Sequence, residues 1–180
     1  YAMATLVFEL LERTDADPDQ HAEWRRIRVM STPGITAMQA AGALVGAPLG
    51  HDFCSISLSD LLTTWDTIKR RILAAAKSDF VIAFYNPVSS RRFKQLSDAC
   101  EILLKHRSPD TPVILAHNLG RNGERVNVVT LANVDPSEAD MLTVVIVGSS
   151  LSKKIQLPNG VVRVYTCLLY TSPSQRDATL

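Results

Sequence analysis

Residues 80–92 read FVIAFYNPVSSRR, and this stretch decides the fold class. Its first six residues, 80–85, are apolar, which is typical of a strand that is buried on both faces of a sheet. Asn86 and Pro87 then lead the chain out of the strand, because asparagine hydrogen-bonds its own turn and proline lacks the N–H that a ladder needs. Residues 90–106 carry apolar side chains at helical spacing. A buried strand that runs directly into a helix is the repeating unit of an α/β sheet.

The flanking segments extend this pattern in both directions. Further helices are expected over residues 2–12, 35–45 and 65–77, and further strands over 26–31, 53–57, 113–117 and 142–147. Strand 80–85, helix 90–106 and strand 113–117 predict a parallel pair of strands joined by a right-handed crossover. Asn122-Gly123 and Pro158-Asn159-Gly160 mark two hairpin turns, whereas residues 14–20 read as a polar loop.

Shifts in composition, together with the glycine and proline residues at positions 46, 48 and 50, predict that the chain has three parts. Residues 1–50 are expected to be the C-terminal remnant of a first, parallel-sheet α/β domain, and residues 51–166 a second α/β domain with a mixed sheet.

Because Tyr1 opens inside a helix, we expect the true start to be missing. Residues 167–177 read CLLYTSPSQRD, and a transposon end used in sequencing libraries, TGT CTC TTA TAC ACA TCT, encodes the first six of these residues. We therefore interpret 167–180 as adapter read-through rather than native sequence; the alternative is an ordinary polar tail.

The composition excludes several classes of protein. Lys+Arg is 19 and Asp+Glu is 18, so the chain lacks the cationic surplus that a nucleic-acid-binding protein needs. The three cysteines are far apart in the sequence, which predicts neither a disulfide framework nor a metal site and fits a reducing cytoplasm. No apolar run is long enough to predict a membrane span. No Walker loop, GxGxxG or metal-ligand spacing is present.

Three stretches place a turn after a strand, where open α/β sheets bind ligands. They are STPGITA at 31–37, YNPVSSRR at 85–92 and HNLGRNGERV at 117–126. In the first, N–H groups at a helix start can receive an acceptor. In the second, Arg91 and Arg92 oppose the macrodipole of the helix start, which costs roughly a few tenths of a kcal/mol per charge unless a polyanion binds there. Local chemistry alone favours a plain turn at each.

Together, these stretches resemble one known family. PGITA at 33–37, AAGALVGAPLGHDFCSISLSDLLTTW at 40–65, SDFVIAFYNPVSSRR at 78–92, LGRNGERV at 119–126 and DMLTVVIVG at 140–148 resemble the tetrapyrrole methylase family, in that order. The resemblance covers residues 1–166 and implies the tetrapyrrole methylase fold. Family members carry a Gly-Asp-Pro-Gly loop before the residues that match Tyr1, and this loop is expected to be missing here.

The resemblance implies a site for S-adenosylmethionine between two α/β domains. Thr36 and Ala37 would line it from the first domain. Tyr85, Asn86 and Pro87 would line it from the second domain, and Asn118, Leu119 and Gly120 would approach the adenosine end. The implied substrate is a tetrapyrrole with many carboxylates, which Arg91 and Arg92 would bind in a bidentate manner.

Within the family, the chain is most similar to members that act in cobalamin biosynthesis on precorrin-3B or its cobalt form. These members methylate ring carbon 17 and contract the macrocycle. Contraction requires that a hydroxyl proton be removed, and we expect His51 or Asp60 to act as the general base. No metal site is expected. The resemblance further implies a cytoplasmic enzyme that binds neither nucleic acid nor membrane and forms a homodimer at full length.

Two alternatives stay open at this point. The chain is either another methylase of the same fold, acting on a different precorrin, ribosomal RNA or the diphthamide pathway, or a non-catalytic α/β binding module. The near-neutral charge argues against RNA. Because a cofactor loop is expected to be missing, we also expect the 180-residue chain to be inactive alone and not to bind S-adenosylmethionine at micromolar concentration.

Overall fold

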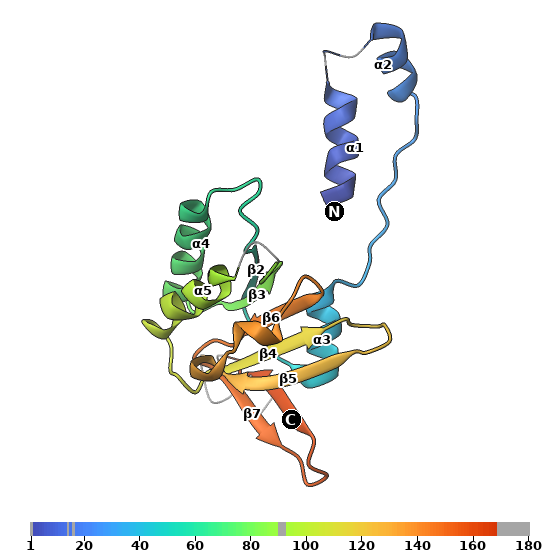
Figure 1. The fold of residues 1–180 in the computed structure, drawn as a ribbon. Coiled ribbons are helices and arrows are strands. Elements are labelled where there is room, and N and C mark those ends of the chain that lie inside the picture. Colours follow the sequence, from blue (N-terminus) through green and yellow to red (C-terminus); the bar gives the residue numbers. More distant parts are fainter. Residues whose placement is uncertain (1, 14, 16, 90–92, 169–180) are drawn as a thin grey trace, which may run out of the picture. The chain divides into compact units, whose positions relative to one another are not determined.

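The computed structural model describes residues 2–13, 15, 17–89 and 93–168, and the chain divides into two units (Figure 1). Unit 1 is Tyr1–Ile35 and unit 2 is Thr36–Leu180. The boundary expected near Gly50 is one between domains of a longer protein, and it stays a prediction. Within this chain, the contacts divide at Ile35. Most of the segment interpreted as read-through, residues 169–180, lies outside the described residues.

Unit 1 contains two helices, α1 (Ala2–Glu12) and α2 (Pro18–Trp24). The helix expected over 2–12 is confirmed, but the polar loop expected over 14–20 is wrong at its end, because α2 begins at Pro18. Proline is favoured at the first helical position, and the carboxylate of Asp17 caps the helix by accepting hydrogen bonds from the N–H groups of Asp19 and Gln20, each at 3.1 Å.

The strand expected over residues 26–31 is also wrong, since these residues form neither helix nor strand. A strand is stabilised by hydrogen bonds to a neighbour. Among the described residues, none of the strands pairs with this segment. Its apolar side chains therefore stay exposed, as Ile27 and Met30 do.

Unit 2 is built on a five-stranded sheet with the strand order β2-β3-β6-β4-β5. The strands are β2 (Phe53–Ser57), β3 (Val81–Tyr85), β4 (Pro112–His117), β5 (Arg125–Thr130) and β6 (Thr143–Val147). β2 and β3 are parallel, and the other neighbouring pairs are antiparallel. The mixed sheet and the first hairpin, β4–β5, are thus confirmed.

The expected pairing of strand 80–85 with strand 113–117 is wrong in one respect. β3 and β4 run in the same direction, because both are antiparallel to β6, but β6 lies between them. Apolar runs predict where strands lie along the chain, whereas the choice of neighbours depends on packing of the whole sheet. The neighbouring parallel pair is instead β2 and β3, joined through α4.

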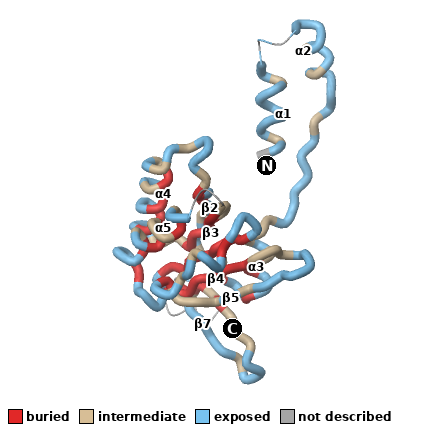
Figure 2. The backbone as a smooth tube through the Cα atoms, viewed as in Figure 1, coloured by how far each residue is buried: buried red, intermediate tan, exposed pale blue. Residues whose placement is uncertain are grey.

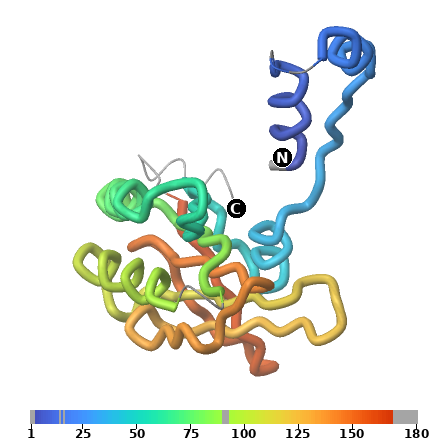
Figure 3. The backbone as a smooth tube through the Cα atoms, turned by 45° about the horizontal axis from the view of Figure 1, so that its top comes forward, coloured from blue at the N-terminus to red at the C-terminus, as the bar shows by residue number. Residues whose placement is uncertain are grey.

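Helices cover both faces of this sheet (Figures 1 and 3). The helices α4 (Trp65–Lys77) and α5 (Lys94–Leu104) pack on one face, over a core that includes Phe84, Leu96 and Leu103; we call this the α4/α5 core. The helix α3 (Ala37–Val45) packs on the other face, over the α3 core, which consists of Ala41, Val45, Val81, Ala83, Ile114, Ala116, Val144, Ile146 and Val164. Figure 2 shows that burial concentrates in these strands and in the inner faces of the helices.

All three of these helices were expected. α4 has the expected bounds, α3 begins two positions after Ile35, and α5 ends at Leu104, two positions before the expected end. Residues 90–92 of the expected helix lie outside the described residues. Two short 3₁₀ helices, η1 (Leu131–Asn133) and η2 (Pro136–Glu138), connect β5 to β6. Within the part of the chain that the structure describes, no helix has both the length and the apolar character that crossing a bilayer requires.

A second, three-stranded sheet has the order β1-β8-β7, from Gly46–Ala47 (β1), Ser152–Gln156 (β7) and Val162–Thr166 (β8). β7 and β8 form the second expected hairpin. β1 lies parallel to β8, and Gly46 has a φ of 132°, which side chains rarely adopt. A Cβ atom at Gly46 would lie 2.7 Å from the carbonyl oxygen of Val164, so only glycine allows this close approach.

Candidate functional site

The carboxyl ends of three strands meet at one edge of the five-stranded sheet. β2 and β3 are parallel, and β4 runs in the same direction, so Ser57, Tyr85 and His117 end their strands at the same edge. Asn86 and Asn118 follow directly. The structure therefore brings together the two second-domain segments that were expected to bind a cofactor, at the edge where open α/β sheets bind ligands. We call this the carboxyl edge.

The start of α3 joins this group through Tyr85. The phenol oxygen of Tyr85 accepts a hydrogen bond of 3.1 Å from the backbone N–H of Met38, in the first turn of α3. Ala37, Tyr85 and Leu119 all pack against the α3 core. Three segments that are distant in the sequence, each containing expected cofactor residues, thus meet on the α3 face of the sheet.

Thr36 carries a polar group that lacks a partner. Its backbone N–H donates to the side-chain oxygen of Gln39 at 3.2 Å, which begins the helix. Its hydroxyl oxygen is buried and faces the N–H of Gln39 as in a capping box, but it forms no hydrogen bond of normal geometry among the described residues. Buried hydroxyl groups in proteins are nearly always hydrogen-bonded. An unpaired one at a helix start fits a site whose ligand supplies the missing partner.

Two asparagines at the carboxyl edge have left-handed backbones, which asparagine tolerates better than most residues. Asn86 has a φ of 52° and donates its side-chain amide to the Ser57 hydroxyl at 3.1 Å. Asn118 has a φ of 54° and donates to the carbonyl oxygen of Asn122 at 2.6 Å. Left-handed residues of this kind cluster at functional sites, where side-chain bonds hold them. Pro87, which follows Asn86, is buried.

The loop after Asn118 is closed by its own hydrogen bonds. The N–H of Gly120 donates to the carboxylate of Glu124 at 2.6 Å, and the N–H of Arg121 donates to the carbonyl oxygen of Asn118 at 3.1 Å. Gly120 has a φ of 72°, which glycine adopts without strain. These hydrogen bonds restrict the shapes that the loop can adopt, and a loop restricted in this way loses less entropy when it binds a ligand.

The two expected bases lie at opposite ends of β2. Asp60 follows β2 near the carboxyl edge, where its carboxylate accepts a hydrogen bond from the side-chain amide of Gln95 at 3.3 Å. His51 precedes β2, so about 16 Å of strand lies between the two residues at about 3.3 Å per residue. They cannot act on the same atom. Asp60 follows Ser57, whose hydroxyl binds Asn86, by three positions along the chain, and its role in catalysis stays a prediction.

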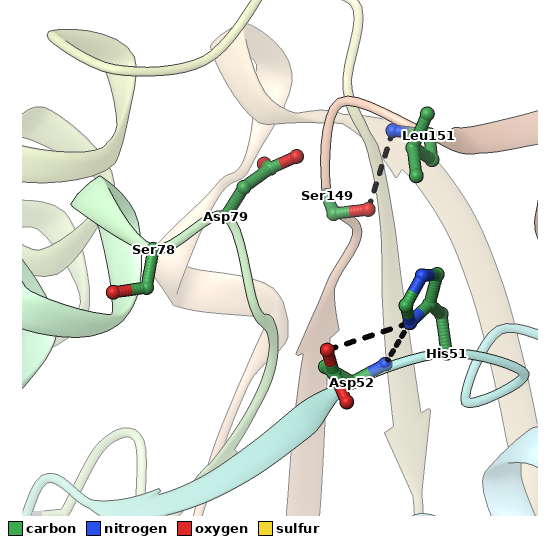
Figure 4. A pocket seen from close by; sticks show the side chains of 6 residues that line it. All are labelled: His51, Asp52, Ser78, Asp79, Ser149 and Leu151. Atoms are coloured by element: carbon green, nitrogen blue, oxygen red, sulfur yellow. Dashed lines mark hydrogen bonds and ion pairs between the residues drawn. The ribbon is translucent and has the colours of Figure 1, made fainter. Parts of the chain in front are cut away.

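His51 instead lines a separate hollow of about 90 Å³ (Figure 4). Its Nδ1 accepts a hydrogen bond of 2.7 Å from the N–H of Asp52. The other residues lining the hollow come from the turn before β3 and the turn after β6: Ser78, Asp79, Ser149 and Leu151. A role for His51 in catalysis stays a prediction.

Arg91 and Arg92, expected to bind substrate carboxylates, lie outside the described residues. Their role in binding substrate carboxylates therefore stays a prediction. Across the described part of the chain, no group of three or more His, Cys, Asp or Glu side chains could hold a metal ion.

His117 begins the stretch 117–126 that the sequence selected, but it was given no role of its own. His117 keeps 13% of its side-chain surface exposed, and its Nδ1 lies 3.1 Å from a carboxylate oxygen of Asp140 and 3.4 Å from the hydroxyl of Thr143. Partial burial acts to raise the pKa of Asp140, but hydrogen bonds from the Thr143 hydroxyl and the Leu142 N–H, together with His117, lower it below its usual value. The sequence signal was a histidine at the end of a buried strand.

Comparison with known proteins identifies the family of the chain. The sequence profile of the Tetrapyrrole (Corrin/Porphyrin) Methylases matches residues 19–135. The chain belongs to this family. The resemblance inferred from the sequence is thereby confirmed.

Relatives of this tetrapyrrole methylase extend the match to nearly the whole chain. It is 43% identical over 175 residues to the precorrin-3B C(17)-methyltransferase of a Sinorhizobium species, covering 97% of the chain and 66% of the relative. It is 45% identical over 170 residues to the cobalt-factor III methyltransferase of Priestia megaterium, covering 92% of the chain and 31% of the relative. The chain therefore spans less than two thirds of the length of either relative.

A solved structure supports the same fold. The crystal structure of the methyltransferase CobJ superposes with a TM-score of 0.74 at 40% identity, covering 83% of the chain and 60% of that protein. The expected fold class, an α/β tetrapyrrole methylase with a mixed-sheet second part, is confirmed.

Proposed function

We propose that the full-length tetrapyrrole methylase containing this chain transfers a methyl group from S-adenosylmethionine to ring carbon 17 of precorrin-3B or its cobalt form, with contraction of the ring. The support comes from relatives at 43% and 45% identity, whose names specify methyl transfer to precorrin-3B and to cobalt-factor III. Because these names differ in the metal state of the substrate, both forms belong in an assay.

The observation that carries the proposal is the hydrogen bond from the Met38 N–H to the Tyr85 phenol. It joins the first turn of α3, two positions after Thr36, to the end of β3, and this supports a common site for the two segments. S-adenosylmethionine, when bound, supplies a methyl group on a sulfonium that is already activated for transfer. The task left to the chain is positioning, which accounts for a large part of the rate in such reactions.

Each group of residues has a role in this proposal. Thr36, with its unpaired hydroxyl, and the N–H groups at the start of α3 bind polar atoms of the cofactor. Asn118, Leu119 and Gly120, held by the closed loop, approach its adenosine end. Asn86 and Pro87 orient the donor toward the substrate, and Arg91 and Arg92 bind substrate carboxylates. A cytoplasmic location and a homodimer stay predictions about the full-length protein.

Activity is tested with the longest open reading frame that contains this chain. The protein is incubated with S-adenosylmethionine and, separately, with precorrin-3B and its cobalt form, and the products are analysed by mass spectrometry. A product that has gained one methyl group at carbon 17 in a contracted ring supports the proposal. Tight cofactor binding without a methylated product from either substrate contradicts it.

The cofactor site is tested by Thr36→Val in the same protein. Valine keeps the shape of threonine but removes the hydroxyl, so we expect S-adenosylmethionine to bind about tenfold more weakly, as for one lost hydrogen bond. The matched control is Thr63→Val, in the loop before α4. Titration calorimetry gives both affinities, and an unchanged affinity in Thr36→Val would remove Thr36 from the site.

A further inference from the structure

Ser57, which was not expected to bind a ligand, lies on the same face of the sheet as the expected cofactor residues. It pairs in register with Tyr85 on the neighbouring parallel strand, so both side chains point to the same face. Tyr85 packs against the α3 core, whereas Ile56, the neighbour of Ser57 along β2, is buried in the α4/α5 core on the opposite face. Ser57 therefore ends β2 at the carboxyl edge with its hydroxyl on the α3 side.

The hydroxyl of Ser57 has its acceptor positions occupied and its proton unshared. Its oxygen accepts a hydrogen bond from the side-chain amide of Asn86 at 3.1 Å and another from the N–H of Ser59 at 3.2 Å. A serine hydroxyl has two acceptor positions and one proton. Among the described residues, no group accepts this proton, and Ser57 is exposed. What the hydroxyl has left to offer is a hydrogen-bond donor.

Tyr85 offers a second donor beside it. Its phenol oxygen accepts from the Met38 N–H at 3.1 Å, and within the described part of the chain no group accepts the phenol proton. Neighbouring strands lie about 4.8 Å apart, so the two side chains leave the sheet next to each other. Two hydroxyl protons from adjacent strands thus face the side of the sheet on which the first turn of α3 lies.

Donors without free acceptors favour one kind of ligand group. A carboxylate has two oxygens and no proton near neutral pH, and it forms stronger hydrogen bonds with such donors than a neutral acceptor does. An ammonium group can only donate, so it would find no free acceptor on Ser57. Both ligands of the proposed function carry carboxylates: S-adenosylmethionine at its methionine end and the tetrapyrrole in its side chains.

We propose that Ser57 is a binding residue of this methylase and that its hydroxyl donates a hydrogen bond to a ligand carboxylate on the α3 face of the sheet. The inference rests on the proposed function, which supplies the two carboxylate-bearing ligands. The bonds from Asn86 and Ser59 hold the hydroxyl oxygen and leave its proton for the ligand. Ser57 thereby adds β2 to the strands that line the candidate site.

The proposal is tested by Ser57→Ala in the longest open reading frame that contains the chain. We expect one of the two ligands to bind about 10- to 100-fold more weakly, as for a lost hydrogen bond to a charged acceptor. Titration calorimetry measures the affinity for S-adenosylmethionine. Absorbance titration in the presence of S-adenosylhomocysteine measures the affinity for the cobalt form of precorrin-3B.

Ser55→Ala is the matched control. Ser55 lies two positions earlier on β2, on the same face of the sheet, and is exposed. Since it lies further from the carboxyl edge, this variant should change both affinities by less than about twofold. Ser57→Thr keeps the hydroxyl on a residue that is well suited to strands, so it should bind both ligands as the unmodified protein does.

A second cofactor identifies which carboxylate is bound. Decarboxylated S-adenosylmethionine keeps the adenosine, the sulfonium and the amine but lacks the carboxylate. If Ser57 binds the cofactor carboxylate, Ser57→Ala weakens the binding of S-adenosylmethionine and leaves that of the decarboxylated form unchanged. If Ser57 binds a substrate carboxylate, both cofactors bind as before and the tetrapyrrole binds more weakly. Equal weakening of both cofactors overturns the proposal, because the loss then does not depend on a carboxylate.

A role of Ser57 through Asn86 alone is separated in a second background. Glycine adopts the left-handed conformation of position 86, where φ is 52°, so Asn86→Gly removes the amide without straining the backbone. In this background, a further loss of about tenfold in affinity for the same ligand on Ser57→Ala supports direct binding. No further loss would mean that Ser57 only holds Asn86, and it overturns the proposal.

The outcomes also separate this proposal from the proposed function. If Ser57→Ala binds both ligands as the unmodified protein does, or if Ser57→Thr loses as much affinity as Ser57→Ala, Ser57 is not a binding residue, whatever product the protein forms. If the unmodified protein methylates neither substrate, yet Ser57→Ala weakens the binding of S-adenosylmethionine and not that of its decarboxylated form, the proposed function fails and the binding role of Ser57 stands.

Discussion

At the scale of single residues, Arg107 is a buried cation that links two strands. Its guanidinium donates hydrogen bonds to the carbonyl oxygens of Gly148, after β6, and Phe80, before β3. Burial lowers the pKa of Arg107, and the nearby carboxylate of Asp79 opposes this shift. A buried charge is tolerated only where polar groups surround it. Arg107 therefore fixes β3 and β6 beside each other at the edge opposite the candidate site.

We predict that Arg107→Met lowers the free energy of unfolding by about 2–4 kcal/mol, because two buried carbonyl groups lose their donors. Urea unfolding followed by circular dichroism measures the change. The control is Arg71→Met, which removes an exposed charge from α4. It should change the free energy of unfolding by less than about 0.5 kcal/mol. Equal effects of the two substitutions would show that the contacts of Arg107 add nothing.

Asp140 makes part of the stability depend on pH. Its pKa in the folded chain lies below the ordinary value of 3.8, so ionisation favours the folded state. This contribution is fully present above about pH 4 and is lost as pH falls through the folded-state pKa. We predict that Asp140→Asn weakens the loss of stability between about pH 5 and pH 3. Urea midpoints measured across this range test the prediction, and parallel curves for the two proteins would contradict it.

Residue patterns predicted several residues of the candidate site but missed the contact between His117 and Asp140 at the same edge of the sheet. Tyr85, Asn86 and Asn118 follow apolar runs, and the rule that ligands bind at strand ends was enough to select their stretches. His117 and Asp140 are 23 residues apart, and only the register of β4 on β6 brings them together. A sequence shows each residue but not the register, so it carried no sign of the pair. The same limit explains why His51 and Asp60, nine positions apart along the chain, were grouped although β2 separates them.

At the scale of elements, β6 shows what periodicity can and cannot predict. Its apolar run, residues 142–147, correctly predicted a buried strand. Its position between β3 and β4 was not predicted, because every buried run of this kind fits a central position equally well. The strand predicted over residues 26–31 was wrong because a local apolar pattern does not supply a neighbour. Among the described residues, none of the strands pairs with this segment.

The pairing of β1 with β8 yields a prediction at this scale. We expect Gly46→Ala to lower the free energy of unfolding by about 1–3 kcal/mol, because the backbone is in a region that alanine avoids and the Cβ atom meets the Val164 carbonyl. Gly34→Ala is the matched control, since nothing lies within 4 Å of its added Cβ atom. Thermal unfolding of both variants tests this. A stable Gly46→Ala protein would mean that β1 and β8 separate easily.

At the scale of the whole molecule, the chain consists of two units that differ in how much of their apolar surface is buried. Unit 2 has two cores, whereas most residues of unit 1 are exposed, including Met3 at 81% and Ile35 at 85%. Residues 28–35, which form neither helix nor strand, connect the helices of unit 1 to unit 2. Exposed connections of this kind are preferred sites of proteolysis.

We predict that brief digestion with trypsin cuts after Arg25, Arg26 or Arg28 and leaves a stable fragment that contains unit 2. Because its cores are complete in themselves, the fragment should unfold within a few degrees of the intact chain. Mass spectrometry identifies the cut, and calorimetry compares the two transitions. A fragment that unfolds at a much lower temperature would show that unit 1 stabilises unit 2.

The insertion of β6 between β3 and β4 has a consequence for synthesis. A nascent chain that has emerged only as far as β5 contains two apolar strands, each with an open edge where β6 belongs. Such edges pair readily with other chains. The sheet closes late, through contacts between distant residues, which is a slow kind of folding step. Translation products that end before Thr143 are therefore expected to aggregate or to require chaperones, rather than to fold as a smaller domain.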